Sequence, residues 1–373
     1  MPNGSISDAD IFAMRIVCWH CLGMPYENLP ETAFWAACRA ASRFAVDKLY
    51  VPKFAITRHD RIATIGSCFA QHIGRRLRAS GALFLDMERA PFGMTDRQAS
   101  AFGYGLFSAR YGNVYTPRQL RDLAQDSRWR RVHRDAVWAK DGRYFDALRP
   151  GVEPDGLATE AAVRLQRYDH LHRVARLFRQ CDILIVTLGL TEYWAHRRTG
   201  RAYATCPGVI AGEFDPAHHV FRNASYVDAY KDVAKALKLI RRRNRSMRVL
   251  LTVSPVPLTA TATGAHALSA NTYSKATLRA VAGDLAAHDP LTDYFPAFEI
   301  ISARPGANDM FEPNLRQVSQ AGVDLVMDQF FAAHPDLGAP ATAPDEQAVQ
   351  SELPDDGHDE DVCEELLLDA MRK

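Results

Sequence analysis

The strongest indication of the fold is the stretch Arg61-Ile62-Ala63-Thr64-Ile65-Gly66-Ser67-Cys68-Phe69-Ala70 in a chain of 373 residues. Its first five residues are mostly apolar and β-branched, a composition that is typical of a buried strand. Gly66 permits a tight turn, and the pattern that follows predicts a helix from about Phe69 to Ser80. A strand that runs directly into a helix is the opening half of a parallel βαβ unit.

The alternation of strand and helix continues along the chain. Further strands are expected at Asp182–Leu188, Arg248–Val253 and Tyr294–Ile301. Further helices are expected at Glu160–Arg179, Tyr226–Arg243, Tyr273–His288 and Gln320–Ala333. This order predicts an α/β protein with a mostly parallel sheet that is covered by helices on both faces. In such sheets ligands bind beyond the carboxyl ends of the strands, so the residues that follow each strand are the candidates for function.

The composition is that of a globular protein, with 47% hydrophobic and 24% charged residues. The chain has no apolar run of about eighteen residues, the length that a membrane-spanning helix needs. The first thirty residues lack the basic-then-apolar layout of a signal peptide. The seven cysteines are scattered, which favours a reducing compartment over a disulfide framework. We therefore expect a cytoplasmic protein that does not interact with a membrane.

Three regions are expected along the chain. Residues 1–56 read as a helical lead-in, and residues 57–337 as the α/β domain. Residues 338–373 carry eleven acidic and two basic residues, a formal charge of −9, which leaves +10 on the rest of the chain. This acidic segment is expected to be largely disordered. Its end could form a short amphipathic helix that docks on the basic body or on a partner protein.

The turn after the first strand places two nucleophilic side chains, Ser67 and Cys68, at the start of a helix. Amide groups at a helix N-terminus lower the pKa of a thiol and stabilise a developing oxyanion. The alternative interpretation is a serine that caps the helix beside a buried cysteine. The second and third strands lead into Gly189–Trp194 and Ser254–Pro257, which would lie at the same edge of the sheet.

The stretch Gly66–Ala70 spells the name motif of the GSCFA family, which is distantly related to the SGNH/GDSL hydrolases. Other stretches that resemble this family are Pro25–Pro30, Arg110–Thr116, Thr187–Glu192, Leu251–Pro257, Tyr273–Lys275 and Tyr294–Pro296 with Glu299. The resemblance covers roughly residues 25–335. It implies a flavodoxin-like, three-layer α/β/α sandwich with an SGNH-hydrolase-type parallel sheet, and it implies ester or acyl-transfer chemistry.

The resemblance also suggests roles for individual residues. In ungapped register Cys68 takes the place of the SGNH serine nucleophile, whereas a slip of one residue would give that role to Ser67. The block Gly189–Glu192 stands where SGNH enzymes have Gly-x-Asn-Asp, which makes Thr191 a candidate oxyanion donor. A middle donor is expected from a glycine region, with Gly93, Gly105, Gly112 or the side chain of Asn113 as candidates. Substrate or oxyanion binding is assigned to Gly189, Thr191, Gly112, Asn113, Tyr273 and Lys275.

The chain departs from the SGNH pattern in its last block. Asn314-Leu315-Arg316-Gln317 stands where Asp-x-x-His is expected, and neither end of it can act as a general base. His266 follows the third strand and is the replacement base that we expect. Glu192 or Glu299 could orient its imidazole, as carboxylates do in catalytic triads. Structural ion pairs to arginine or Lys275 would explain these glutamates equally well.

These observations predict an acyltransferase or esterase that forms a covalent acyl intermediate at the turn. The substrate would be a small molecule, a glycan or a biosynthetic intermediate, and the positive body would suit a CoA or carrier-protein thioester donor. No cofactor is expected, and no metal, since Cys18 and Cys21 lack a second ligand pair. No nucleic-acid-binding module is recognisable. The alternative is a non-hydrolytic binding or partner-docking protein that keeps the scaffold without the Asp-x-x-His pair.

Overall fold

The computed structural model describes residues 26–40, 43–303 and 308–338. The pair Cys18 and Cys21 and the acidic segment after Gly338 lie outside the described residues. The chain divides into two units, Met1–Leu49 and Tyr50–Lys373. In the first unit, the described elements are η1 (Glu31–Ala33), η2 (Trp35–Cys38), β1 (Arg39–Ala40) and β2 (Arg43–Phe44). The described part of the lead-in, which was expected to be helical, thus contains short 3-10 helices and an antiparallel strand pair.

The second unit begins at Tyr50, earlier than the expected start of the α/β domain. The Tyr50 hydroxyl donates to Asp293 Oδ2 at 3.0 Å. Ile56 is fully buried, and its N–H donates to His334 Nδ1 at 3.4 Å. Residues 50–56 therefore pack as part of the α/β unit.

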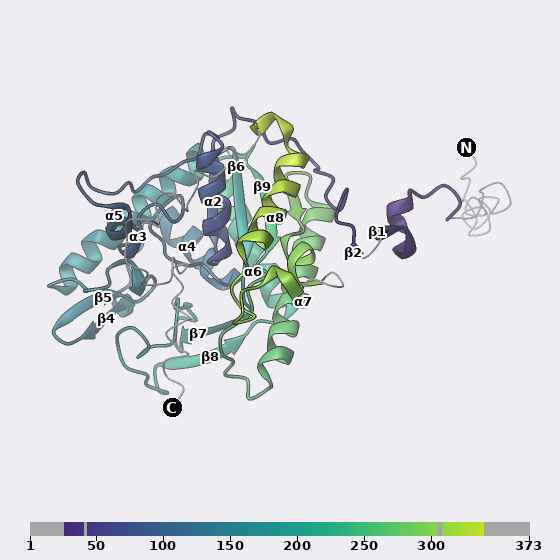
Figure 1. Cartoon of the computed structure of the whole chain (residues 1–373). Coiled ribbons are helices and arrows are strands. Elements are labelled where there is room, and N and C mark those ends of the chain that lie inside the picture. Colours follow the sequence, from purple (N-terminus) through teal and green to yellow (C-terminus); the bar gives the residue numbers. More distant parts are fainter. Residues whose placement is uncertain (1–25, 41–42, 304–307, 339–373) are drawn as a thin grey trace, which may run out of the picture. The chain divides into compact units, whose positions relative to one another are not determined.

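The centre of the second unit is a four-stranded parallel sheet in the order β10-β9-β6-β3. Its middle strands, β6 and β9, are labelled in Figure 1. Its strands are β3 (Ile62–Gly66), β6 (Ile183–Leu188), β9 (Arg248–Val253) and β10 (Thr292–Phe295). The prediction of a parallel sheet is confirmed. The fourth strand was expected to reach Ile301, and that part of the prediction is wrong. Pro296 has no N–H for the ladder, and a π-helical segment, η5 (Glu299–Ala303), follows it.

Helices cover both faces of the sheet, as expected. They are α2 (Phe69–Ala79), α3 (Asp96–Ala101), α4 (Pro117–Trp129), α5 (Glu160–Gln180), α6 (Tyr226–Arg241), α7 (Ala267–His288) and α8 (Gln320–Ala333). Alternate strand residues point to opposite faces. Ile65 and Val186 therefore pack with apolar residues of α4, α5, α6 and α7, whereas Ile62 and Ile185 pack with α2 and α8. The result is a three-layer α/β/α sandwich.

Two antiparallel hairpins and several short helices extend this sandwich. The hairpins are β4 (Val137–Lys140) with β5 (Arg143–Asp146), and β7 (Glu192–His196) with β8 (His219–Asn223). The short helices are η3 (Arg134–Ala136), η4 (Pro150–Val152), η6 (Asn308–Met310) and η7 (Pro335–Leu337). The β7–β8 hairpin begins directly after the carboxyl end of β6, at the edge where ligands bind in sheets of this type.

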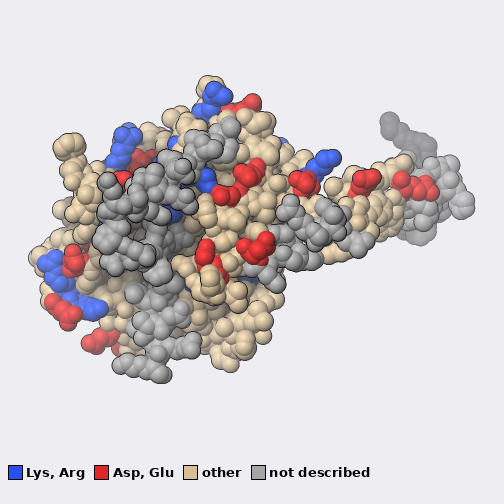
Figure 2. All heavy atoms as spheres, viewed as in Figure 1, with Lys and Arg blue, Asp and Glu red and all other residues tan. Residues whose placement is uncertain are grey.

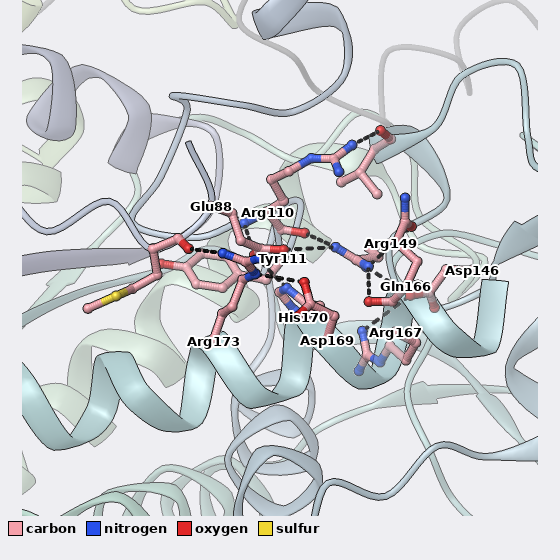
Figure 3. Close-up of polar contacts among 12 residues, drawn as sticks. Glu88, Arg110, Tyr111, Asp146, Arg149, Gln166, Arg167, Asp169, His170 and Arg173 are labelled. Atoms are coloured by element: carbon pink, nitrogen blue, oxygen red, sulfur yellow. Dashed lines mark hydrogen bonds and ion pairs between the residues drawn. The ribbon is translucent and has the colours of Figure 1, made fainter. Parts of the chain in front are cut away.

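A buried ionic network holds the segment before α4 against α5 (Figure 3). Arg149 is fully buried, and it donates to Arg110 O at 2.7 Å and to Asp146 Oδ2 at 2.8 Å. Glu88 Oε2 accepts from the Arg110 amide and lies 2.7 Å from His170 Nδ1. The cost of removing these charges from water is offset because each charged group has several hydrogen-bond or ion-pair partners. The network therefore fixes the course of the chain just before residues 112–116.

The charged side chains visible in Figure 2 are mixed in sign, and neither the basic nor the acidic residues form one continuous patch on this face. On this face the excess of basic residues in the body does not gather into one surface.

Candidate active site

The turn after β3 requires a glycine. Gly66 has a φ of 150°, and a Cβ at this position would lie 2.3 Å from the carbonyl oxygen of Thr187. The Ser67 amide donates to that same oxygen at 3.1 Å. The absence of a side chain thus lets β3 run close beside β6 up to the point where α2 begins.

Ser67 and Cys68 point into different surroundings. Ser67 is 2% exposed, and its hydroxyl has no hydrogen-bond partner among the described residues. A Cβ at Gly189 would lie 3.1 Å from Ser67 Cβ, so this side chain faces the end of β6. Cys68 is 4% exposed and packs in an apolar cluster with Tyr115 and Leu190. The two candidate nucleophiles are therefore both buried, and their immediate neighbours differ.

Cys68 occupies the N-cap position of α2. The amides of Ala70 and Gln71 donate to the carbonyl oxygens of Ser67 and Cys68. The amide of Phe69 precedes them in the first turn, where helix amides have no intrahelical acceptor. It is therefore the amide at this helix end that can stabilise negative charge beside Cys68.

The segment 112–116 lies alongside this turn. The Val114 amide donates to Gly66 O at 2.8 Å, which brings the preceding residue, Asn113, beside the start of α2. Asn113 is 2% exposed, and its Oδ1 accepts from Gln71 Nε2 at 3.5 Å. This contact holds the Asn113 side chain beside the first turn of α2.

The end of β6 is fastened to the same segment. The amides of Gly189 and Leu190 both donate to Tyr115 O at 2.9 Å. The Thr191 amide donates to Ser274 Oγ at 2.8 Å, and its hydroxyl donates to Asn223 Oδ1 at 2.7 Å. Both donors of Thr191, a candidate for the oxyanion site, are therefore committed to structural contacts.

Lys275 joins the ends of β6 and β9. It is 1% exposed, and its Nζ donates to Gly189 O at 2.8 Å and to Val256 O at 2.7 Å. The sequence assigned Lys275 and Tyr273 to substrate or oxyanion binding. Tyr273 is 45% exposed and donates to Ala224 O at 3.4 Å. Lys275 is thus a buried positive charge that holds the loops after β6 and β9 together. It lies on α7, the helix that also contributes Ala270 to the apolar cluster around Cys68.

A cavity of about 240 Å³ opens beside this cluster. Three of its lining residues, Tyr115, Leu190 and Leu258, also pack with Cys68. Further lining residues come from β7, β8 and the loop after β9. Cys68 itself is not among the lining residues, so it lies one layer of side chains away from the cavity.

Glu192, the first residue of β7, contributes a carboxylate to the cavity. Thr261 Oγ1 donates to its oxygens at 2.8 and 3.0 Å, and the Ala262 amide donates at 3.4 Å. Partial burial raises the pKa of Glu192, and these hydrogen bonds offset the effect only in part. A carboxylate with a raised pKa is a better proton acceptor near neutral pH.

The other two expected acid–base residues have different surroundings. His266 is exposed and is the N-cap of α7, where its Nδ1 accepts from the Leu268 amide at 3.1 Å. A neutral imidazole that accepts at Nδ1 carries its hydrogen on Nε2, and Nε2 then cannot accept a proton. Glu299 accepts from Arg279 Nε and from the Tyr294 hydroxyl. Glu299 therefore has the ion pair that the sequence offered as its alternative role.

The segment that replaces Asp-x-x-His forms a turn closed by its own side chains. Asn314 Oδ1 accepts from the amides of Arg316 and Gln317 at 3.0 and 2.9 Å, and its Nδ2 donates to Gln317 Oε1. Asn314 is exposed. The turn thus supplies no acid–base group to the site.

Sequence reasoning did not find the aromatic lining of the cavity or the role of Tyr115. Tyr115 stands in the stretch Arg110–Thr116 that resembles the family, and this resemblance could have indicated that Tyr115 belongs to the site. The aromatic residues of β7 and β8 carry no motif, because their relation to the turn arises only in the folded chain. Among the described residues, no helix is long and apolar enough to cross a membrane. That same part of the chain has no group of three or more metal-ligating side chains placed to hold an ion.

A model of the GSCFA family matches residues 61–330. Among solved structures, the chain is similar to a salicylyl-acyltransferase from a tetracycline biosynthetic pathway, with 15% identity and a TM-score of 0.25. That match covers 45% of this chain and 41% of the acyltransferase, so this chain spans about two fifths of the length of that protein. The chain is also similar to an acetyl esterase mutant solved with an acetate ion, at 11% identity and a TM-score of 0.31. This match covers 72% of this chain and 93% of the other. No curated protein matches the chain in sequence.

Proposed function

The chain belongs to the GSCFA family, and from that premise we propose that it transfers acyl groups through a covalent intermediate on Cys68. The observation that carries this proposal is the position of the thiol. Cys68 lies at the N-terminus of α2, beyond the carboxyl end of β3, and packs against side chains that line a cavity. Helix N-termini favour a thiolate and stabilise an oxyanion on an attached acyl group.

In the first step, the Cys68 thiol gives its proton to Glu192, and the sulfur attacks the carbonyl carbon of an ester or thioester. The carbonyl oxygen becomes an oxyanion, which the Phe69 amide stabilises by a hydrogen bond. Collapse of this intermediate expels the alcohol or thiol, which takes the proton from Glu192. Water or an acceptor hydroxyl then gives its proton to Glu192 and attacks the carbonyl carbon of the Cys68 thioester. The carbon–sulfur bond breaks, the acyl group leaves as a free acid or a new ester, and the Cys68 sulfur takes the proton back from Glu192.

We assign the proton to Glu192 because it is the one of the three expected acid–base residues that lines the cavity. Its raised pKa suits this role. His266 uses Nδ1 to cap α7, and Glu299 is bound to Arg279. His266 would serve as base only after giving up that cap, which contributes about 1 kcal/mol to helix stability.

The experiment is to treat the protein with a para-nitrophenyl ester and to locate the acyl group by mass spectrometry. We expect the acyl group on Cys68, and no labelling in Cys68→Ala. Ser67→Ala is the matched control, and it should retain labelling because Ser67 faces Gly189 and is not part of the apolar cluster against the cavity. An acyl group on Ser67, or full activity of Cys68→Ala, would contradict the proposal.

A specific observation favours the second candidate, a binding protein on the same scaffold. Asn314–Gln317 supplies no general base, and Cys68 is only 4% exposed. If Cys68 does not react with iodoacetamide at neutral pH while a ligand binds the cavity, the binding function is the correct one. The donor in the enzymatic case would be a thioester of CoA or of a carrier protein. Its phosphates would lie outside the cavity, since the described residues that line the cavity include no Lys or Arg.

A further inference from the structure

The cavity beside Cys68 has the chemistry of an acyl-binding pocket. We propose that the acyl group transferred through Cys68 is uncharged and apolar, of the size of a benzoyl or hexanoyl group, and that it lies in the cavity against the β7–β8 hairpin. This inference rests on the proposed function and names the substrate class of that same site.

The location of the cavity supports the assignment. Tyr115, Leu190 and Leu258 are the residues common to the cavity wall and the cluster around Cys68. A carbonyl carbon bonded to Cys68 Sγ would lie on the cluster side of this wall. The remainder of the acyl group would extend past these side chains into the cavity.

Aromatic side chains form another part of the cavity lining. Trp194 and Phe221 come from the two strands of the β7–β8 hairpin, with ring centroids 5.5 Å apart. Trp194 also packs edge-on against Phe214 at 5.0 Å. Tyr203, which is 3% exposed, lines the cavity from the segment after β7. These ring contacts hold the wall in place without a ligand, and a preformed wall reduces the ordering cost of binding.

The charges around the cavity exclude an anionic acyl group. Among the described lining residues, Glu192 is the one carboxylate, and no Lys or Arg is present to pair with an anion. Burial raises the pKa of the Cys206 thiol to about 11 and that of the Tyr203 hydroxyl to about 12, so both groups are neutral at pH 7. A succinyl or malonyl carboxylate would lose its hydration there without gaining a partner.

The volume of the cavity limits the size of the acyl group. An apolar cavity of about 150 Å³ holds a benzene molecule. The present cavity measures about 240 Å³, which is enough for a ring or a chain of similar bulk. An acetyl group would leave most of this apolar surface uncovered, and each methylene group that is buried adds to the binding energy.

The experiment compares Cys68 acylation rates for para-nitrophenyl acetate, hexanoate, benzoate and hydrogen succinate. We expect hexanoate and benzoate to react at least about tenfold faster than acetate at equal low concentration, because they bury more apolar surface. The succinate ester should react more slowly than hexanoate by at least the same factor. Equal rates for acetate and hexanoate, or a fast succinate reaction, would overturn the inference while leaving the acyl-transfer proposal in place.

A pair of variants tests the location. Ala260 is exposed at the rim and lines the cavity, so Ala260→Trp should lower the ratio of hexanoate to acetate rates at least about tenfold. Ala265 is exposed in the same loop and outside the lining, so Ala265→Trp should leave the ratio at the wild-type value. An unchanged ratio in Ala260→Trp would place the acyl group elsewhere.

Failure of the acyl-transfer proposal can be distinguished from failure of this inference. If no ester acylates Cys68, the proposed function fails, and binding of benzamide to Cys68→Ala, followed by ligand-observed NMR, tests the cavity directly. Saturable binding that is weakened by Ala260→Trp would support an apolar pocket. Absence of saturable binding would overturn it.

Discussion

The replacement of Lys275 by methionine tests whether one buried ammonium group holds the site together. Its Nζ donates to Gly189 O at 2.8 Å and to Val256 O at 2.7 Å, and the residue is 1% exposed. Methionine fills a similar volume but cannot donate a hydrogen bond. Two carbonyl oxygens would then lose their charged donor at the ends of neighbouring strands.

The magnitude follows from these two contacts. A hydrogen bond that involves a charged group contributes about 1.5–3 kcal/mol, so the two bonds together contribute about 3–6 kcal/mol. Removal of the buried charge recovers part of this, because the ammonium group no longer has to lose its hydration. We therefore expect Lys275→Met to lower the free energy of unfolding by about 2–4 kcal/mol.

The assay is urea unfolding followed by circular dichroism at neutral pH. Lys238→Met is the matched control, because Lys238 is exposed on α6 and its loss should change stability by less than about 0.5 kcal/mol. Amide hydrogen exchange should accelerate at Gly189 and Leu190 in Lys275→Met, since their loop is no longer tied to Val256. A change in unfolding free energy no larger than that of the control would refute the reasoning.

Three further perturbations test other parts of the structure. Gly66→Ala should destabilise the fold by at least about 2 kcal/mol, because the new Cβ would lie 2.3 Å from Thr187 O; an unchanged melting temperature would contradict this. Burial lowers the pKa of His170 from 6.5 to about 4, so the unfolded chain binds this proton first. Wild-type stability should fall as the pH drops from about 6.5 to about 4, and His170→Gln should lose less in that window when urea midpoints are compared. Leu258→Ala removes one of the side chains between the cavity and Cys68. Iodoacetamide labelling of Cys68, followed by peptide mass spectrometry, should become several-fold faster. An equal labelling rate would mean that another side chain controls access to the thiol.

The strands of the sheet could be predicted because their composition leaves little choice. Arg248–Val253 was predicted to the residue, since its apolar and β-branched side chains are buried on both faces of the sheet. The end of β10 was missed because Pro296 stops the ladder within an apolar stretch. Helix α7 begins at Ala267, before the expected Tyr273. Its start was missed because Ser269, Asn271 and Thr272 have low helix propensity and the N-cap is a histidine, which is not among the residues that usually cap helices.

The candidate site was predictable only where one local stretch creates it. The turn at Gly66–Cys68 could be found because strand, glycine and helix follow one another directly. The N-cap position of His266 could not, because an exposed N-cap histidine and a catalytic histidine look the same in sequence. The buried Arg149 was also beyond prediction, since arginine is usually exposed and its partners come from distant segments.

Backbone and lysine contacts link the site segments in a single series. Val114 binds Gly66 O, Tyr115 O accepts from Gly189, and Lys275 binds Gly189 O and Val256 O. Every link uses a main-chain oxygen, so the positions of these segments depend little on the side chains that line the cavity. The cavity wall, by contrast, consists of side chains from a hairpin and an exposed loop, which can change without disturbing these links. Substitutions in the hairpin and loop should therefore alter the preferred acyl group, whereas substitutions in the linked segments should alter the rate for every substrate.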